Sequence, residues 1–145
     1  MLLLCKMNFM KNRLYILLLL SLLVFAFKPN EPLRVFLVGD STMANKLPAD
    51  YPETGWGIPF AGLFNEAVEV QNHAYNGRST KSFRTEGRWA KVFDQIKPGD
   101  YVFIQFGHND AKLSDTSRYA AAQTDYRKNL TRYIQETRSK GGIPV

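Results

Sequence analysis

The stretch VFLVGDSTM, Val35–Met43, decides the fold class of this 145-residue chain. Its first half is rich in β-branched residues and almost continuously apolar, which is typical of a strand buried on both faces of a parallel sheet. The apolar run stops at Gly39 and gives way to Asp, Ser and Thr. Two later stretches, Asn72–Thr80 (NHAYNGRST) and Val102–Asp110 (VFIQFGHND), break in the same manner. Polar residues therefore follow three separate apolar or alternating runs.

The remaining elements are predicted from hydrophobic spacing and from turn residues. Strands are expected at Leu33–Val38, Val68–Asn72, Tyr101–Phe106 and from Ile143 onward, helices at Trp56–Phe64, at Arg84–Ile96 and over a long segment that ends near Lys140, and a loop at Met43–Gly55. Strands that alternate with helices predict an α/β fold with a parallel sheet covered on both faces.

The N-terminal residues 1–27 resemble a targeting segment. They contain no Asp or Glu, and Lys6, Lys11 and Arg13 precede the apolar run Leu14–Phe27. A basic flank followed by a short apolar run is typical of a secretory signal peptide. A membrane span usually needs ~20 apolar residues, so an N-terminal anchor is the second interpretation. Residues 28–145 are then expected to form the domain, and the protein to be secreted or periplasmic.

Composition excludes several classes of function. The net charge is +6, and half of it lies in the leader. The rest shows no basic tract, so we expect no nucleic-acid partner. The single cysteine, Cys5, is in the leader, and with only two histidines in the chain we predict no disulfide, metal or cofactor. We expect a monomer without membrane contact beyond the leader.

Ser41, Gly77 and Asn109 are the candidate functional residues, because each follows the end of a predicted strand. In an open parallel sheet, ligands bind at the carboxyl ends of the strands, so the three should meet at one rim. A serine there can act as a nucleophile, a glycine can offer an unobstructed backbone N–H, and an Asn amide offers two uncharged donors. Taken singly, Ser41 and Gly77 are better explained by a turn, and Asn109 fits a turn as well as an oxyanion donor.

Other residues near these strand ends have different interpretations. His108 adjoins Asn109 and is interpreted as structural or substrate-lining, with a general base as the alternative. Packing roles are favoured for His73 and for Trp56, although a tryptophan could also stack on a sugar. Arg78, Ser79, Thr80 and Asp110 lie close to the expected rim without an assigned role.

Together these motifs resemble the SGNH hydrolases, also called GDSL-like esterases. GDST at Gly39–Thr42, NGRS around Gly77 and GHND around Asn109 resemble blocks I to III of that family. The longer stretches VGDSTMANK, GWG, NHAYNGRSTKSF, EGRW and GDYVFIQFGHND resemble its rhamnogalacturonan acetylesterase branch, from about Arg34 to Val145.

The resemblance implies a flavodoxin-like α/β/α fold and a serine esterase that removes acetyl groups from pectic or related plant cell-wall polysaccharides. Ser41 matches the nucleophile, and the backbone N–H groups of Ser41 and Gly77 with the Asn109 side chain match the oxyanion hole. The alternatives are an esterase acting on xylan acetyl groups or acyl lipids, and a non-catalytic remnant that binds glycans or nothing.

The family's base is a histidine in a D-x-x-H block near the C-terminus, and this block has no match here. Neither His73 nor His108 follows an aspartate by three residues. A serine without a base keeps the high pKa of an alcohol and attacks poorly. We therefore expect residues 28–145 to be the N-terminal portion of a longer, C-terminally truncated hydrolase domain, inactive by itself.

Overall fold

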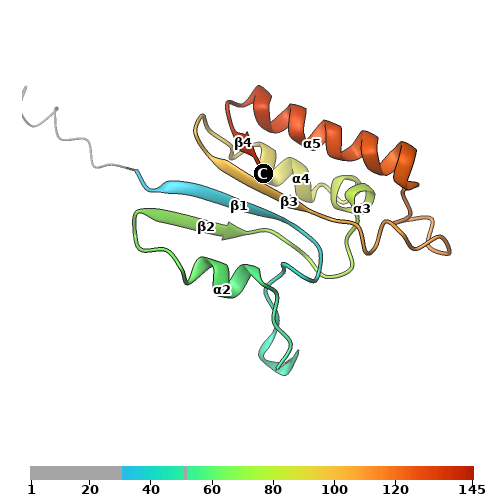
Figure 1. Ribbon diagram of the computed structural model, residues 1–145, viewed down its shortest axis with the longest axis horizontal. Helices are drawn as coiled ribbons and strands as arrows, with labels where there is room; N and C mark the ends of the chain where they lie inside the picture. Colours follow the sequence, from blue (N-terminus) through green and yellow to red (C-terminus); the bar gives the residue numbers. More distant parts are fainter. Residues whose placement is uncertain (1–30, 51) are drawn as a thin grey trace, which may run out of the picture. The chain divides into compact units, whose positions relative to one another are not determined.

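The computed structural model describes residues 31–50 and 52–145, and the predicted leader at residues 1–27 lies outside them. Pro32–Val145 forms one compact unit around a four-stranded parallel sheet. Its strands, in the order β2-β1-β3-β4, are β1 (Leu33–Gly39), β2 (Val68–Asn72), β3 (Tyr101–Gln105) and β4 (Ile143–Pro144) (Figure 1). All four predicted strands are therefore confirmed.

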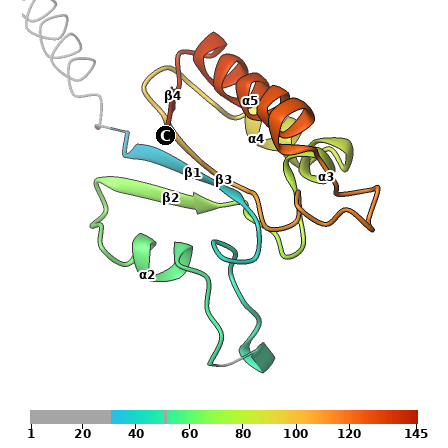
Figure 2. The same cartoon turned by 45° about the vertical axis from the view of Figure 1, so that its right-hand side comes forward.

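Helices cover both faces of the sheet, as predicted. One face carries α2 (Gly57–Ala61), and the other carries α3 (Thr80–Thr85), α4 (Arg88–Phe93) and α5 (Arg127–Ser139) (Figures 1 and 2). A 3-10 turn, η1 (Pro48–Asp50), lies in the predicted loop, and a π-helical turn, η2 (Ala122–Tyr126), leads into α5. This arrangement is the expected three-layer α/β/α architecture.

Alternation along the strands divides the core into two clusters. Phe36 and Val38 of β1 pack with Phe83, Trp89 and other residues of the α3, α4 and α5 layer. Val35 and Leu37, on the opposite face of the same strand, pack in the cluster on the α2 side. Because successive side chains of a strand point to opposite faces, a strand covered on both sides must be apolar throughout. This explains the continuous apolar run that opens VFLVGDSTM.

The helix predicted over Arg84–Ile96 is wrong as a single element. The structure has two helices there, and the first of them begins earlier, at Thr80. Ser79 caps α3, and its hydroxyl accepts from the N–H of Ser82 while the Ser82 hydroxyl accepts from the N–H of Ser79. The chain then breaks at Gly87, whose φ of 72° is left-handed and ends a right-handed helix.

Helix α5 confirms the predicted long helix and its stop. It ends at Ser139, and Gly141 follows with a left-handed φ of 75°. On its inner face Tyr133 is fully buried, and Leu130 and Ile134 are half-buried. No helix among residues 31–50 and 52–145 is long and apolar enough to cross a bilayer.

Tyr133→Phe should lower the free energy of unfolding by about 0.5–1.5 kcal/mol. The Tyr133 hydroxyl donates to the carbonyl of Thr80 at 3.0 Å, and the phenylalanine would remove this buried hydrogen bond between α5 and the first residue of α3. Urea unfolding followed by circular dichroism measures the change. Tyr101→Phe is the matched control, because its hydroxyl makes no hydrogen bond to any described residue. Equal midpoints for the two variants would contradict the assignment.

Candidate functional site

Ser41 lies in a turn directly after β1, and Asp40 holds that turn. The Asp40 side chain is fully buried, and its Oδ1 accepts from the backbone N–H of Thr42 at 3.0 Å and from the Thr42 hydroxyl at 2.9 Å. Ser41 is half-buried, and neither its hydroxyl nor its backbone N–H is hydrogen-bonded to a described residue. The turn therefore presents a hydroxyl and an N–H that no residue in the described part of the chain engages.

Gly77 adopts a left-handed conformation with φ 77°, which a residue with a Cβ would adopt only with strain. Its N–H donates to no described residue. The carbonyl of the same peptide group, on Asn76, accepts a hydrogen bond from Nη1 of Arg78 at 2.9 Å. Because C=O and N–H point in opposite directions in a trans peptide, this bond turns the Gly77 N–H away from the guanidinium.

Asn109 lies in the loop after β3, with only 1% of its surface exposed. Its Nδ2 donates to the backbone carbonyl of Arg78 at 3.0 Å. A side-chain amide has two N–H donors, and this bond uses one of them. The other N–H donates to no described residue, and the bond to Arg78 ties the Asn109 side chain to the segment that carries Gly77.

The three candidate residues follow β1, β2 and β3, which are neighbouring parallel strands and end at the same edge of the sheet (Figures 1 and 2). Hydrogen bonds link residues that flank the candidates. The N–H of Tyr75 donates to the carbonyl of Gly39 at 3.0 Å, and the Thr42 hydroxyl, whose one hydrogen is shared with Asp40, lies 2.8 Å from Gln105 Oε1. With the bond from Asn109 to Arg78, each segment is joined to another. The roles of the three residues remain predictions.

The neighbouring polar residues Ser79, Thr80 and Asp110 are structural. Ser79 caps α3, and the N–H and hydroxyl of Thr80 both donate to the carboxylate of Asp110. Asp110 is 3% exposed, and burial raises its pKa above the ordinary value. These contacts join the start of α3 to the loop after β3, and so hold the loop that carries Asn109.

His73 and Trp56 pack against other side chains, as predicted. The His73 ring stacks on Phe36 with centroids 5.7 Å apart, and burial lowers its pKa. The Trp56 ring meets Phe60 edge-on at 5.5 Å, and its Nε1 donates to Gln105 at 3.4 Å. His108 is exposed and makes no hydrogen bond to a described residue, so its role stays open.

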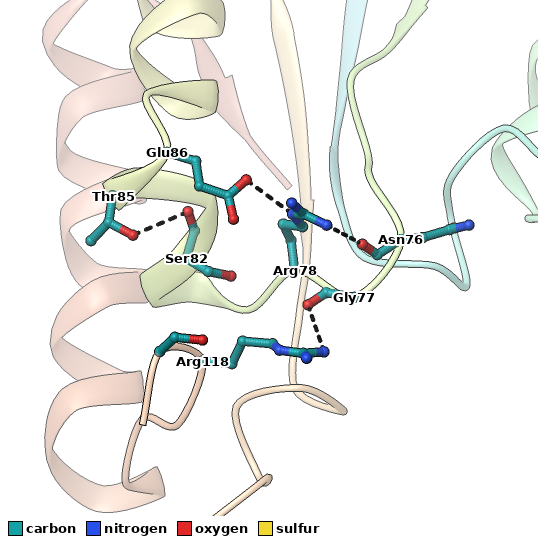
Figure 3. A pocket seen from close by; sticks show the side chains of 8 residues that line it. Asn76, Gly77, Arg78, Ser82, Thr85, Glu86 and Arg118 are labelled. Carbon is teal, nitrogen blue, oxygen red and sulfur yellow. Dashed lines mark hydrogen bonds and ion pairs between the residues drawn. The ribbon is translucent and has the colours of Figure 1, made fainter. Parts of the chain in front are cut away.

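A polar pocket of about 510 Å³ opens beside Gly77 (Figure 3). Its lining comes from the Gly77 segment, from α3 and from the loop after β3, and consists of Asn76, Gly77, Arg78, Ser82, Thr85, Glu86, Ser117 and Arg118. We call this the Gly77 pocket. Sequence reasoning missed Glu86 and Arg118, because neither residue lies at a strand end. Arg118 is also 41 residues from Gly77 in the sequence, although its Nη1 donates to the Gly77 carbonyl.

Two guanidinium groups in the Gly77 pocket are paired with carboxylates. Arg78 Nε lies 3.0 Å from Glu86 Oε2, and Arg118 Nε lies 2.6 Å from Asp115 Oδ2. Hydrogen bonds from arginines lower the pKa of Glu86, so this carboxyl is charged at neutral pH. Among residues 31–50 and 52–145 there is no group of three or more His, Cys, Asp or Glu side chains placed to hold a metal ion.

Comparison with known proteins gives a consistent family. The model of the GDSL-like lipase/acylhydrolase family matches residues 37–145. The rhamnogalacturonan acetylesterase RhgT of Bacillus subtilis is 45% identical over 79% of this chain and 48% of its own. The rhamnogalacturonan acetylesterase of Emericella nidulans is 45% identical over 52% of this chain and 28% of its own.

A solved structure agrees with these sequence matches. That of the Bacillus subtilis protein YxiM aligns with a TM-score of 0.70 at 25% identity, over 81% of this chain and 32% of that one. The chain spans about half the length of RhgT and under a third of the Emericella enzyme. It therefore corresponds to part of each relative.

Asp110→Asn should remove a pH dependence of stability. A carboxyl with a raised pKa binds its proton more tightly in the folded protein, so the free energy of unfolding falls as the pH rises from 3.8 through the raised pKa. The asparagine does not titrate, so this fall should be absent from urea unfolding curves of the variant taken between about pH 3 and about pH 8.

Asp115→Asn is the control with the opposite sign. Hydrogen bonds from Ser117 and the charge of Arg118 lower the pKa of Asp115, so its contribution to stability is present above pH 3.8 and is lost as the pH falls through the lowered pKa. A wild-type slope unchanged by Asp110→Asn would contradict the proposed burial effect.

Proposed function

Because the chain belongs to the GDSL-like lipase/acylhydrolase family, we propose that the protein is a serine esterase that removes acetyl groups from a pectic polysaccharide. Two relatives that are 45% identical to it carry the name rhamnogalacturonan acetylesterase, which supports both the ester chemistry and the pectic substrate. The proposal includes no cofactor, nucleic acid or second copy of the chain.

The observation that carries the proposal is the hydrogen bond from Asn109 Nδ2 to the Arg78 carbonyl. It ties the amide donor to the segment of Gly77, whose own N–H donates to none of residues 31–50 and 52–145. An oxyanion hole needs donors that are held in place before charge develops, because preorganised donors cost no rearrangement in the transition state. The bond supplies that restraint.

In the proposed reaction, Ser41 Oγ attacks the carbonyl carbon of the acetyl group while a general base takes its proton. The carbonyl oxygen becomes an oxyanion, which accepts from the N–H groups of Ser41 and Gly77 and from the Asn109 amide. The sugar oxygen leaves with the proton from the base. Water then attacks the acetyl-serine, and acetate and the free serine are released.

The general base comes from outside the described residues in this proposal. Among residues 31–50 and 52–145, no histidine is hydrogen-bonded to an aspartate, and the His73 ring is engaged with Phe36. The resemblance to SGNH hydrolases points to a histidine of a D-x-x-H block. The 145-residue chain alone is accordingly expected to release no acetate.

We place the protein outside the cytoplasm, either secreted or periplasmic. The support is the sequence of residues 1–27, with basic residues ahead of an apolar run and without any Asp or Glu. A polymeric plant substrate is too large to enter a cell, so an extracellular enzyme is consistent with the proposed substrate.

A substrate panel separates the proposed activity from its alternatives. The full-length protein should release acetate from acetylated pectin faster than from acetylated xylan, and should hydrolyse p-nitrophenyl acetate faster than p-nitrophenyl esters of long acyl chains. Preference for long chains would indicate a lipase instead. Absence of acetate release from every substrate would indicate a non-catalytic protein.

Asn109→Ala in the full-length protein should lower kcat by about 10²–10³ with little change in KM, because the amide contacts the oxyanion only in the transition state. Release of p-nitrophenol from p-nitrophenyl acetate measures this. Ser41→Ala should abolish both turnover and labelling by a fluorophosphonate.

Asn65→Ala is the matched control for Asn109→Ala. Asn65 accepts from the N–H of Ala67 just before β2, at the opposite end of the strand from the rim, so its loss should leave kcat unchanged. Unaltered turnover in Asn109→Ala would remove this amide from the oxyanion hole.

A further inference from the structure

We propose that the Gly77 pocket is a subsite that binds the carboxylate of a uronate residue in the acetylated polysaccharide. This inference rests on the proposed function and extends it, because it names the feature of the glycan that the protein recognises. It is carried by the charge of the pocket, by the unused donors of its arginines and by the position of the pocket beside Gly77.

The charge at the Gly77 pocket favours an anion. Arg78 and Arg118 line it, and Arg88 adds a third guanidinium, 2.8 Å from Glu86. Glu86 and Asp115 are the carboxylates bound to these three arginines. Three positive charges against two negative charges leave the cluster with a net positive charge. This charge attracts an anionic sugar and does not repel a neutral one.

The arginines of the pocket have donors to spare. A guanidinium has five N–H donors. Arg78 uses Nε with Glu86 and Nη1 with the Asn76 carbonyl, while Arg118 uses Nε with Asp115 and Nη1 with the Gly77 carbonyl at 3.4 Å. No hydrogen bond within residues 31–50 and 52–145 uses Nη2 of either side chain.

These guanidinium groups are also held in place and accessible. Their side chains are 29% and 35% exposed, and Arg78 stacks over the ring of Tyr75 at 4.6 Å. Planar guanidinium groups fixed by carboxylates and by an aromatic ring lose little freedom on binding a carboxylate. The remaining N–H donors match carboxylate oxygens, and such charge-assisted bonds are the strong ones.

Shape and position fit a sugar next to the ester. A volume of about 510 Å³ lies within the range of ~300–1,000 Å³ usual for ligand pockets, and most of the lining is polar. Figure 3 shows Arg78 and Arg118 approaching the Gly77 segment from two sides. The Gly77 carbonyl contacts Arg118, and the Gly77 N–H is the proposed oxyanion donor. A uronate in the pocket would therefore lie beside the segment that carries Gly77.

A methylation test examines the carboxylate directly. The probes are a non-acetylated rhamnogalacturonan oligosaccharide and the same oligosaccharide with its carboxylates converted to methyl esters. Binding is measured by calorimetry to the full-length protein carrying Ser41→Ala. We expect methylation to weaken binding about tenfold or more, as expected for loss of a charged hydrogen bond, and salt to weaken binding of the acid but not of the ester.

Arg118→Gln assigns the effect to the pocket. In this variant the acid and the methyl ester should bind equally, whereas Arg138→Gln, an equal loss of charge in the last turn of α5, should keep the tenfold difference. Arg118→Lys keeps the positive charge but lacks the forked N–H donors of a guanidinium. The difference in affinity between the acid and the methyl ester should then be intermediate, provided that circular dichroism shows each variant folded.

Three outcomes would overturn the subsite. The first is equal affinity of the acid and the methyl ester for the protein with Arg118 intact. The second is a difference in affinity between the two probes that is as large in Arg118→Gln as in Arg138→Gln. The third is the same salt dependence of binding for both probes. Hydrolysis of p-nitrophenyl acetate by the protein with Ser41 intact is measured separately. Because that substrate has no uronate, failure of the subsite and failure of the esterase proposal are distinguishable.

Discussion

The central position of β1 is the constraint on which the rest of the structure depends. It is hydrogen-bonded to β2 on one side and to β3 on the other, with Leu37 opposite Asn72 and Gly39 opposite Gln105. Parallel pairing places the ends of three strands at one edge of the sheet. Every interaction proposed for the site starts from that edge, so loss of the register would separate the candidate residues.

The strand ends would not by themselves define a site, because loops are free to diverge from an edge. Here hydrogen bonds between backbone and side chains hold them together. The carbonyl of Arg78 accepts from Asn109, its guanidinium fixes the peptide that precedes Gly77, and Glu86 in turn holds the guanidinium. The same residue therefore restrains two of the three proposed oxyanion donors, which links their positions mechanically.

Arg78 also joins this restraint to the Gly77 pocket, whose wall it forms with Arg118. A ligand that binds these guanidinium groups would contact the groups that orient the Gly77 peptide. The proposed uronate subsite and the proposed oxyanion hole thus share structure, and selection for an anionic glycan would act on the same side chains as selection for turnover.

The sequence by itself determined the fold class, the four strands, the two-sided covering of the sheet and the family, because apolar periodicity and strand-end motifs are local signals. It also indicated packing roles for Trp56 and His73. The division between α3 and α4 was missed for two reasons. Ser82 stands where a capping box usually has Glu or Gln, and a single glycine such as Gly87 does not by itself indicate a left-handed conformation.

Only the tertiary structure decided how the rim is held and charged. The bond from Asn109 to Arg78 spans 31 residues, and that from Arg118 to Gly77 spans 41. No pattern of neighbouring residues encodes such a pair, since the two partners meet only after the sheet has formed and the loops have closed over its edge. Local sequence patterns identify the residues that can react. Long-range packing determines which other residues position them.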